Sequence, residues 1–198
     1  MSHMVGLPAM LRIAMQAGVI GSRSLPVSFA PLVSSVVSSF LSRGFSIASG
    51  GAVGADSFAL SALLQQGAAS SSVIFSAWQS ASGFPSSVRP QVSQFIASGG
   101  QVVWGTGSVG APRQQVVSAL LGRNRQLVSA CSVLVAFLYG SSRGSLYTVR
   151  QAVSHGIPVI VYVCGGGAYL PPDLINNSNI HSLDIGNWTL DILDKEVI

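Results

Sequence analysis

The strongest constraint on the fold is an alternation of two kinds of segment along the chain. Short apolar runs rich in β-branched residues are separated by longer segments in which apolar residues recur at helical spacing. The runs are mostly continuous, which is typical of parallel strands buried on both faces of a sheet. The predicted strands are Ala17–Ile20, Phe45–Ala48, Val73–Ala77, Gln101–Trp104, Val133–Phe137 and Pro158–Val163.

The segments between these runs carry the signals of helices. The last of them is followed by Gly156 and Pro158, residue types that end helices. The predicted helices are Pro26–Ser42, Ala55–Gln66, Val88–Ala97, Pro112–Ala130 and Ser145–His155. A repeated strand–helix–strand order predicts the α/β class: a doubly wound, mostly parallel, Rossmann-like sheet with helices on both faces.

Charge is scarce and unevenly distributed. Charged residues make up 8% of the chain, against about 25% in ordinary globular proteins. Residues 1–172 hold nine arginines and one aspartate, a net charge of +8, whereas residues 173–198 hold five acids and one lysine, a net charge of −4. We therefore expect a Rossmann-like domain over residues 5–170. The acidic C-terminal segment 171–198, with a short helix over Trp188–Val197, is expected to pack on the same domain or on a partner.

The arginine-rich body indicates an anionic partner. Guanidinium groups bind phosphate in a bidentate manner that lysine does not match. A basic body therefore predicts binding of single-stranded DNA or RNA, a nucleotide or another anion. The alternative is that the arginines only keep the surface soluble.

Other residue types point to a cytoplasmic protein without metal, cofactor or membrane contact. Cys131 and Cys164 lie in or beside apolar runs, as expected of buried thiols in a reducing compartment. No run reaches the roughly 18 apolar residues of a membrane helix. His155 and His181 are not spaced with cysteines as metal ligands would be.

The segment 49–56, SGGAVGAD, is the first candidate site. Doubly wound sheets bind ligands at the carboxyl ends of their strands. Glycines between a strand and a helix let the backbone approach a phosphate near the helix N-terminus, which predicts a cradle formed by Ser49, Gly50, Gly51 and Gly54. The alternative is a tight turn without a ligand.

Asp56 is the only carboxylate in the first 172 residues. It falls in the first turn of the predicted helix, where the helix dipole favours a negative charge. We expect it to fix the helix start and to orient Arg23 from the neighbouring loop.

Three further motifs supply phosphate-binding candidates. In two of them the alternative is structural: Ser145 as a helix cap, and the GRNR arginines as a solvated helix face. The candidates are Gly21, Ser22 and Arg23 in GSR, Arg123, Asn124 and Arg125 in GRNR, and Arg143, Gly144 and Ser145 in SSRGS. One acid and one histidine within residues 5–172 are too few for a Ser-His-Asp triad, so no catalytic residue is predicted and binding is favoured over catalysis.

Taken in order, these motifs resemble the DNA-processing protein A family (DprA, Smf). Over about residues 17–166 the chain carries G-S-R, S-G-x-A-x-G-x-D, R-N-R and S-x-G-S-L-x-T. The family has a Rossmann-like domain of the wider SLOG superfamily, which also contains the LOG-type phosphoribohydrolases. The resemblance implies binding of single-stranded DNA, homodimerisation, and transfer of DNA to a recombinase. The DNA-contacting residues that it implies are Arg23, Gly50, Gly51, Arg123, Asn124, Arg125 and the Gly144–Ser145 turn.

Two other functions fit the same loops. One is a sensor or carrier of a small nucleotide or a phosphorylated cofactor, and the other is a nucleotide phosphoribohydrolase-like enzyme. The hydrolase branch carries P-G-G-x-G-T-x-x-E, which this sequence lacks. Non-enzymatic binding of single-stranded nucleic acid in a basic, glycine-rich crevice is therefore the first hypothesis.

Overall fold

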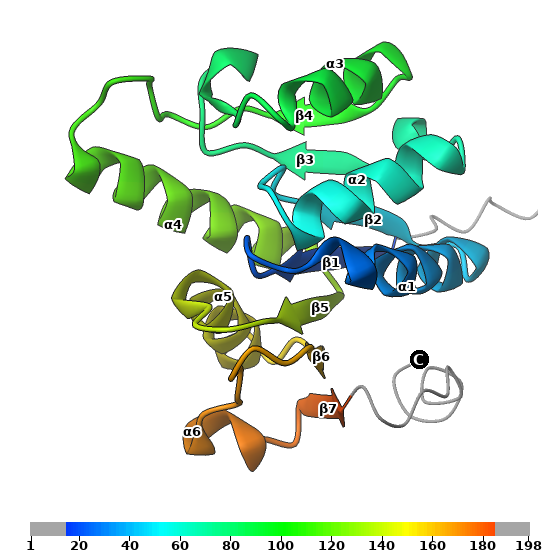
Figure 1. The fold of residues 1–198 in the computed structure, drawn as a ribbon, viewed down its shortest axis with the longest axis vertical. Helices are drawn as coiled ribbons and strands as arrows, with labels where there is room; N and C mark the ends of the chain where they lie inside the picture. Colours follow the sequence, from blue (N-terminus) through cyan, green and yellow to red (C-terminus); the bar gives the residue numbers. More distant parts are fainter. Residues whose placement is uncertain (1–14, 185–198) are drawn as a thin grey trace, which may run out of the picture.

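A single parallel sheet organises the chain. The computed structural model describes residues 15–184. Their seven strands lie in the order β4-β3-β2-β1-β5-β6-β7, and every neighbouring pair is parallel (Figure 1). The strands are β1 (Gln16–Gly21), β2 (Ser46–Ser49), β3 (Val73–Phe75), β4 (Gln101–Val103), β5 (Val133–Leu138), β6 (Val159–Val163) and β7 (Ile180–Asp184).

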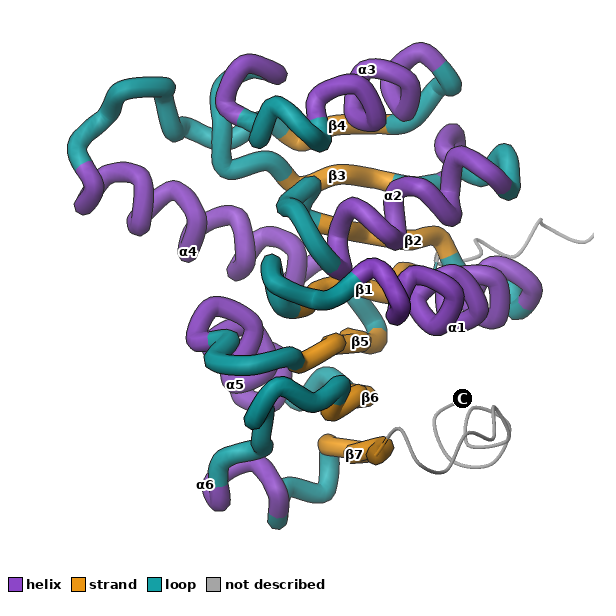
Figure 2. The backbone as a smooth tube through the Cα atoms, in the orientation of Figure 1, coloured by secondary structure: helices purple, strands orange, loops and turns teal. Residues whose placement is uncertain are grey.

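Helices cover both faces of this sheet (Figure 2). One face is covered by α1 (Ala30–Ser42), α2 (Ala55–Gln65) and α3 (Arg89–Ala97), and the other by α4 (Arg113–Ala130), α5 (Arg143–Ser154) and the short α6 (Pro172–Ile175). The predicted doubly wound α/β fold is confirmed.

The central strand β5 explains why the apolar runs do not alternate with polar residues. All six of its side chains are buried. Every second one packs in the core under α1 and α2, and the others pack in the core under α4 and α5. A strand buried on both faces needs apolar residues at every position.

The acidic C-terminal segment contributes elements that its sequence did not reveal. Residues Ile180–Asp184 form β7, which pairs with β6, and α6 precedes it. The stretch IHSLD lacks a continuous apolar run because an edge strand is only partly covered. The Asp173 carboxylate of α6 accepts two hydrogen bonds from the Arg150 guanidinium of α5, at 2.8 and 3.2 Å. The predicted helix Trp188–Val197 lies outside the described residues.

The chain order creates one switch point in the sheet. Successive strands run outward from β1 to β4, and α4 then returns across the sheet so that β5 pairs with the other side of β1 (Figure 1). The loops that follow β1 and β5 therefore leave the sheet side by side, where ligands bind in this class of fold. Within residues 15–184, no helix has the length and apolar character needed to cross a membrane.

The two-sided burial of β5 predicts that Phe137→Ala destabilises the fold strongly. Phe137 is fully buried and stacks on Tyr162 with ring centroids 5.0 Å apart. Truncating such a side chain costs about 3–5 kcal/mol of unfolding free energy. Urea denaturation would measure the loss, with Val27→Ala as a control because Val27 is 77% exposed. Equal midpoints for Phe137→Ala and the parent would contradict the prediction.

Candidate nucleic-acid interface

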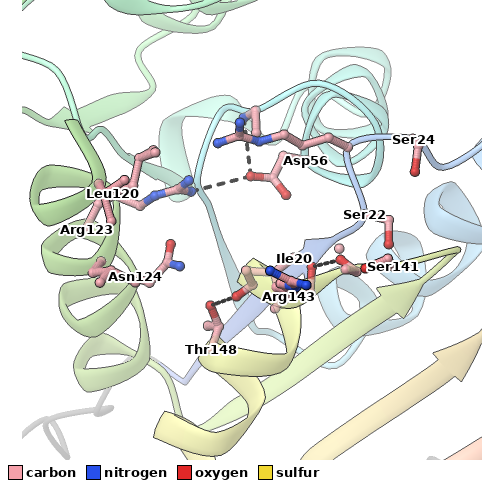
Figure 3. A pocket seen from close by; sticks show the side chains of 18 residues that line it. Ile20, Ser22, Ser24, Asp56, Leu120, Arg123, Asn124, Ser141, Arg143 and Thr148 are labelled. Carbon is pink, nitrogen blue, oxygen red and sulfur yellow. Dashed lines mark hydrogen bonds and ion pairs between the residues drawn. The ribbon is translucent and has the colours of Figure 1, made fainter. Parts of the chain in front are cut away.

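A buried ion pair joins α4 to α2 at the switch point. Nη1 of Arg123 lies 3.5 Å from Oδ2 of Asp56, and the two side chains are only 8% and 5% exposed. The backbone N–H of Ala52 donates to the same oxygen at 3.2 Å. Figure 3 shows Arg123 reaching from its helix toward Asp56. The lone acid of the basic body thus neutralises a buried guanidinium.

Arg23 was predicted as the partner of Asp56, and its charge does act on the Asp56 carboxylate. Asp56 lies in the first turn of α2, but it is Arg123 that contacts its carboxylate. Arg23 is exposed in the loop after β1, whereas the return of α4 across the sheet buries Arg123. Burial raises the pKa of the Asp56 carboxyl, and the nearby charges of Arg123 and, more weakly, Arg23 oppose that rise.

The glycines of the predicted cradle serve this ion pair and the turn around it. A Cβ on Gly50 would overlap the Arg123 guanidinium, and it would lie 2.7 Å from Oδ2 of Asp56. Gly51 and Gly54 have φ of 65° and 79°, a region that side chains rarely adopt. Gly50 therefore lets a guanidinium approach the backbone, and Gly51 and Gly54 allow the turn around it.

Arg123 lies where three cavities meet. The serine cavity, of about 410 Å³, lies between the loops after β1 and β5. The middle cavity, of about 400 Å³, lies above the loops after β2 and β3. The flank cavity, of about 460 Å³, lies between α4 and the loop after β4. Arg123 lines all three, and its Nε is buried without a hydrogen-bond partner.

The start of α5 lines part of the serine cavity. No side chain caps the first turn of α5, since the Oγ of Ser142 donates instead to the Oγ of Ser145 at 2.7 Å. The N-terminal N–H groups of a helix and its dipole favour an anion. Arg143 and Gly144 belong to the same turn and line the cavity. The structure therefore brings an uncapped helix start and the Arg143 side chain to the same cavity.

Ser22 holds the two loops of the serine cavity together. Its N–H donates to the Phe137 carbonyl, and its Oγ accepts from the Tyr139 N–H, both at 2.8 Å. The loop after β1 is thereby tied to the loop after β5. Ser22 lines the cavity, but its N–H and its Oγ already take part in these two hydrogen bonds within the protein.

The structure brings most of the predicted residues together. Ser49 and Gly54 line none of the three cavities, and Ser49 Oγ is buried without a hydrogen-bond partner. Gly50 and Gly51 line the middle cavity, and Arg125 lines the flank cavity. The predicted site residues that line the serine cavity are Gly21, Ser22, Arg23, Asp56, Arg123, Asn124, Arg143, Gly144 and Ser145.

The two arginines of RNR have different environments. Arg123 faces the sheet and is buried, whereas Arg125 is exposed on the outer side of α4. Two residues along a helix differ by about 200° in direction, so the motif places one guanidinium inward and the other outward. Asn124, between them, lines the serine cavity.

Sequence reasoning missed the aromatic part of the site. Trp78, Phe84 and Arg89 line the middle cavity, and Arg89 Nε donates to the Phe84 carbonyl at 2.8 Å. Trp104 lines the flank cavity. The loops after β3 and β4 contain glycine and leave the carboxyl ends of their strands, but Trp78, Phe84 and Trp104 belong to none of the four motifs that carry the family resemblance.

Comparison with known proteins identifies the family. A sequence profile described as DNA recombination-mediator protein A matches residues 3–177. The chain belongs to the DNA recombination-mediator protein A family. No curated protein sequence matches it. Within residues 15–184, no group of three or more histidine, cysteine or acidic side chains is placed to hold a metal ion.

Solved structures share the fold of this family member. DNA processing protein A from Helicobacter pylori, described as binding single-stranded DNA, has a TM-score of 0.67 and 19% identity over 85% of this chain and 74% of its own. The Streptococcus pneumoniae protein has a TM-score of 0.60 and 23% identity, and 83% of this chain covers 54% of it. A molybdenum cofactor carrier protein from Chlamydomonas reinhardtii has a TM-score of 0.54 and 16% identity over 85% of this chain and 89% of its own.

The ion pair predicts that Asp56→Asn is far more harmful than loss of an exposed acid. The substitution leaves the buried Arg123 charge without its counter-ion, which costs about 3–5 kcal/mol of unfolding free energy. Asp173→Asn is the control, because it breaks the exposed pair with Arg150 and should change stability little. Chemical denaturation would measure the unfolding free energy of both variants. Equal losses in Asp56→Asn and Asp173→Asn would contradict the prediction.

The cysteines are predicted to be unreactive in the folded protein. Cys131 and Cys164 are buried as expected, and burial raises the pKa of each thiol to about 12. The thiolate is the reactive form, so neither should react with a disulfide reagent at neutral pH. Thiol titration should find both groups only after denaturation. Rapid labelling of the native protein would refute this prediction.

Proposed function

We propose that the crevice around Arg123 binds single-stranded DNA without converting it chemically. Family membership supports this function, as does the fold shared with a Helicobacter pylori relative described as binding single-stranded DNA. The arrangement of charge in the crevice is the observation that carries the proposal.

Arginines line all three cavities with little opposing charge. Asp56 is the only acidic residue that lines them, and its carboxylate is engaged by Arg123. The positive charges of the other arginines are therefore available to phosphates, which draw nucleic acid to basic surfaces. The arginines of the crevice are Arg23, Arg89, Arg123, Arg125 and Arg143.

Binding fits these residues better than catalysis. A general base is most often a histidine or a carboxylate within reach of the substrate. Asp56 is 5% exposed and bonded to both Arg123 and the Ala52 N–H. Its geometry supports a role in holding an arginine rather than in moving a proton.

The family suggests further features of the same proposal. We expect a cytoplasmic homodimer that passes DNA to a recombinase, and RNA is an alternative ligand for a site that contacts phosphates. A small nucleotide or phosphorylated cofactor is the second ligand class. The serine cavity by itself would suit such a small ligand, whereas an extended strand would need the neighbouring cavities as well. The binding experiment below separates these ligands.

The proposal predicts a specific change in salt dependence. Fluorescence anisotropy with labelled oligo-dT would compare the parent with the Arg23→Ala/Arg143→Ala double variant. Each lost phosphate contact reduces the slope of log affinity against log salt by about 0.7, so the double variant should lose about 1.4. Arg43→Ala is the matched control because Arg43 caps α1 just before β2, at the opposite edge of the sheet.

Three results would separate the alternatives. Failure of the parent to bind oligo-dT at about 50 mM salt would overturn the proposal. Unchanged affinity and slope in the double variant would show that the DNA-binding site lies elsewhere on the protein. Equal competition by a mononucleotide would favour the small-ligand function, and tighter binding of oligo-U would favour RNA.

A further inference from the structure

The flank cavity lies on the opposite side of α4 from the serine cavity. The α4 residues that line each cavity recur at spacings of three and four, so each set occupies one side of the helix. Gln115, Ser118, Ala119, Gly122 and Gln126 face the flank cavity, whereas Val117, Leu120, Leu121 and Asn124 face the serine cavity. Arg123 is the one residue that lines both cavities, and its buried side chain lies on the side of α4 that faces the sheet.

Trp104 presents an aromatic surface to the flank cavity. It directly follows β4 and is 41% exposed, an unusual state for so large an apolar ring. The centroids of the Trp104 ring and of the buried Phe84 ring are 6.1 Å apart, in an edge-on arrangement. Phe84 therefore supports the indole on one side, while much of its surface stays open.

The remaining lining of the cavity is polar and positively charged. Arg125 and Gln126 are exposed on α4, Gln115 lies about three turns earlier, and no acidic residue lines the cavity. The opposite wall is rigid, because the Gly105 N–H donates to the Trp78 carbonyl at 2.9 Å and the Gly107 N–H to the Ala77 carbonyl at 2.8 Å. An aromatic face beside a guanidinium is the combination with which proteins hold the bases and phosphates of single strands.

We propose that the flank cavity is a base-stacking subsite for single-stranded DNA, with the Trp104 indole as its stacking surface and Arg125 as its phosphate contact. This inference rests on the proposed function. A strand held in the serine cavity reaches the subsite by crossing the outer side of α4. Arg125 lies on that outer side, because it points away from the buried Arg123.

The test compares Trp104→Ala with the parent on two ligands. Oligo-dT provides bases and phosphates, and an abasic strand of the same length provides the phosphates alone. Loss of one stacked base should weaken oligo-dT binding about 5- to 150-fold. Binding of the abasic strand should not change. Trp104→Phe should restore much of the affinity, since it keeps an aromatic face.

Tyr169→Ala is the matched control, because Tyr169 is an aromatic residue that is 67% exposed and lines none of the three cavities. Its affinity for both ligands should equal that of the parent. Intrinsic fluorescence gives a second readout, because oligo-dT should quench the parent and Tyr169→Ala but quench Trp104→Phe less.

Several outcomes would overturn the subsite. One is parental affinity of Trp104→Ala for oligo-dT, and another is an equal loss on the abasic strand. A change in oligomeric state by sedimentation, with DNA affinity retained, would assign Trp104 to a protein contact instead. In each case the parent still binds oligo-dT, so the proposed function survives. If the parent itself does not bind, the proposed function fails first.

Discussion

The ion pair between Arg123 and Asp56 determines how the carboxyl edge of the sheet is built. A guanidinium that is nine-tenths buried requires a nearby negative charge, and Asp56 supplies the only one among the cavity-lining residues. The pair joins the helix that crosses the sheet to the helix that follows β2. Because Arg123 borders all three cavities, the shape of each depends on this one contact.

The same contact accounts for the charge pattern of the chain. In a body with nine arginines, further carboxylates at the crevice would weaken the positive potential on which the proposed phosphate binding rests. The acids are instead concentrated after residue 172, where Asp173 is paired with Arg150 outside the crevice. Among the described residues, Asp56 is thus the one acid that lines the crevice.

The sequence predicted most of the fold and part of the site. Continuous apolar runs in β1, β5 and β6 marked buried parallel strands, because burial on both faces constrains every position. The edge strand β7 was missed because half-covered positions tolerate polar residues. The ion pair of Asp56 with Arg123 was not predicted, because nothing local in a sequence shows which arginine a crossing helix will bring to a given acid. The role proposed for Trp104 depends on the same crossing, which places α4 beside the loop after β4.

The close approach of Arg123 to Gly50 has a consequence for how relatives of this chain vary. A side chain at position 50 would occupy the space of the guanidinium, and loss of Asp56 would leave that guanidinium uncompensated. A smaller residue at position 123 would free that space but would leave the Asp56 carboxylate without its counter-charge. Positions 50, 56 and 123 therefore behave as one unit of sequence change, and an alignment of relatives should show them retained together or replaced together.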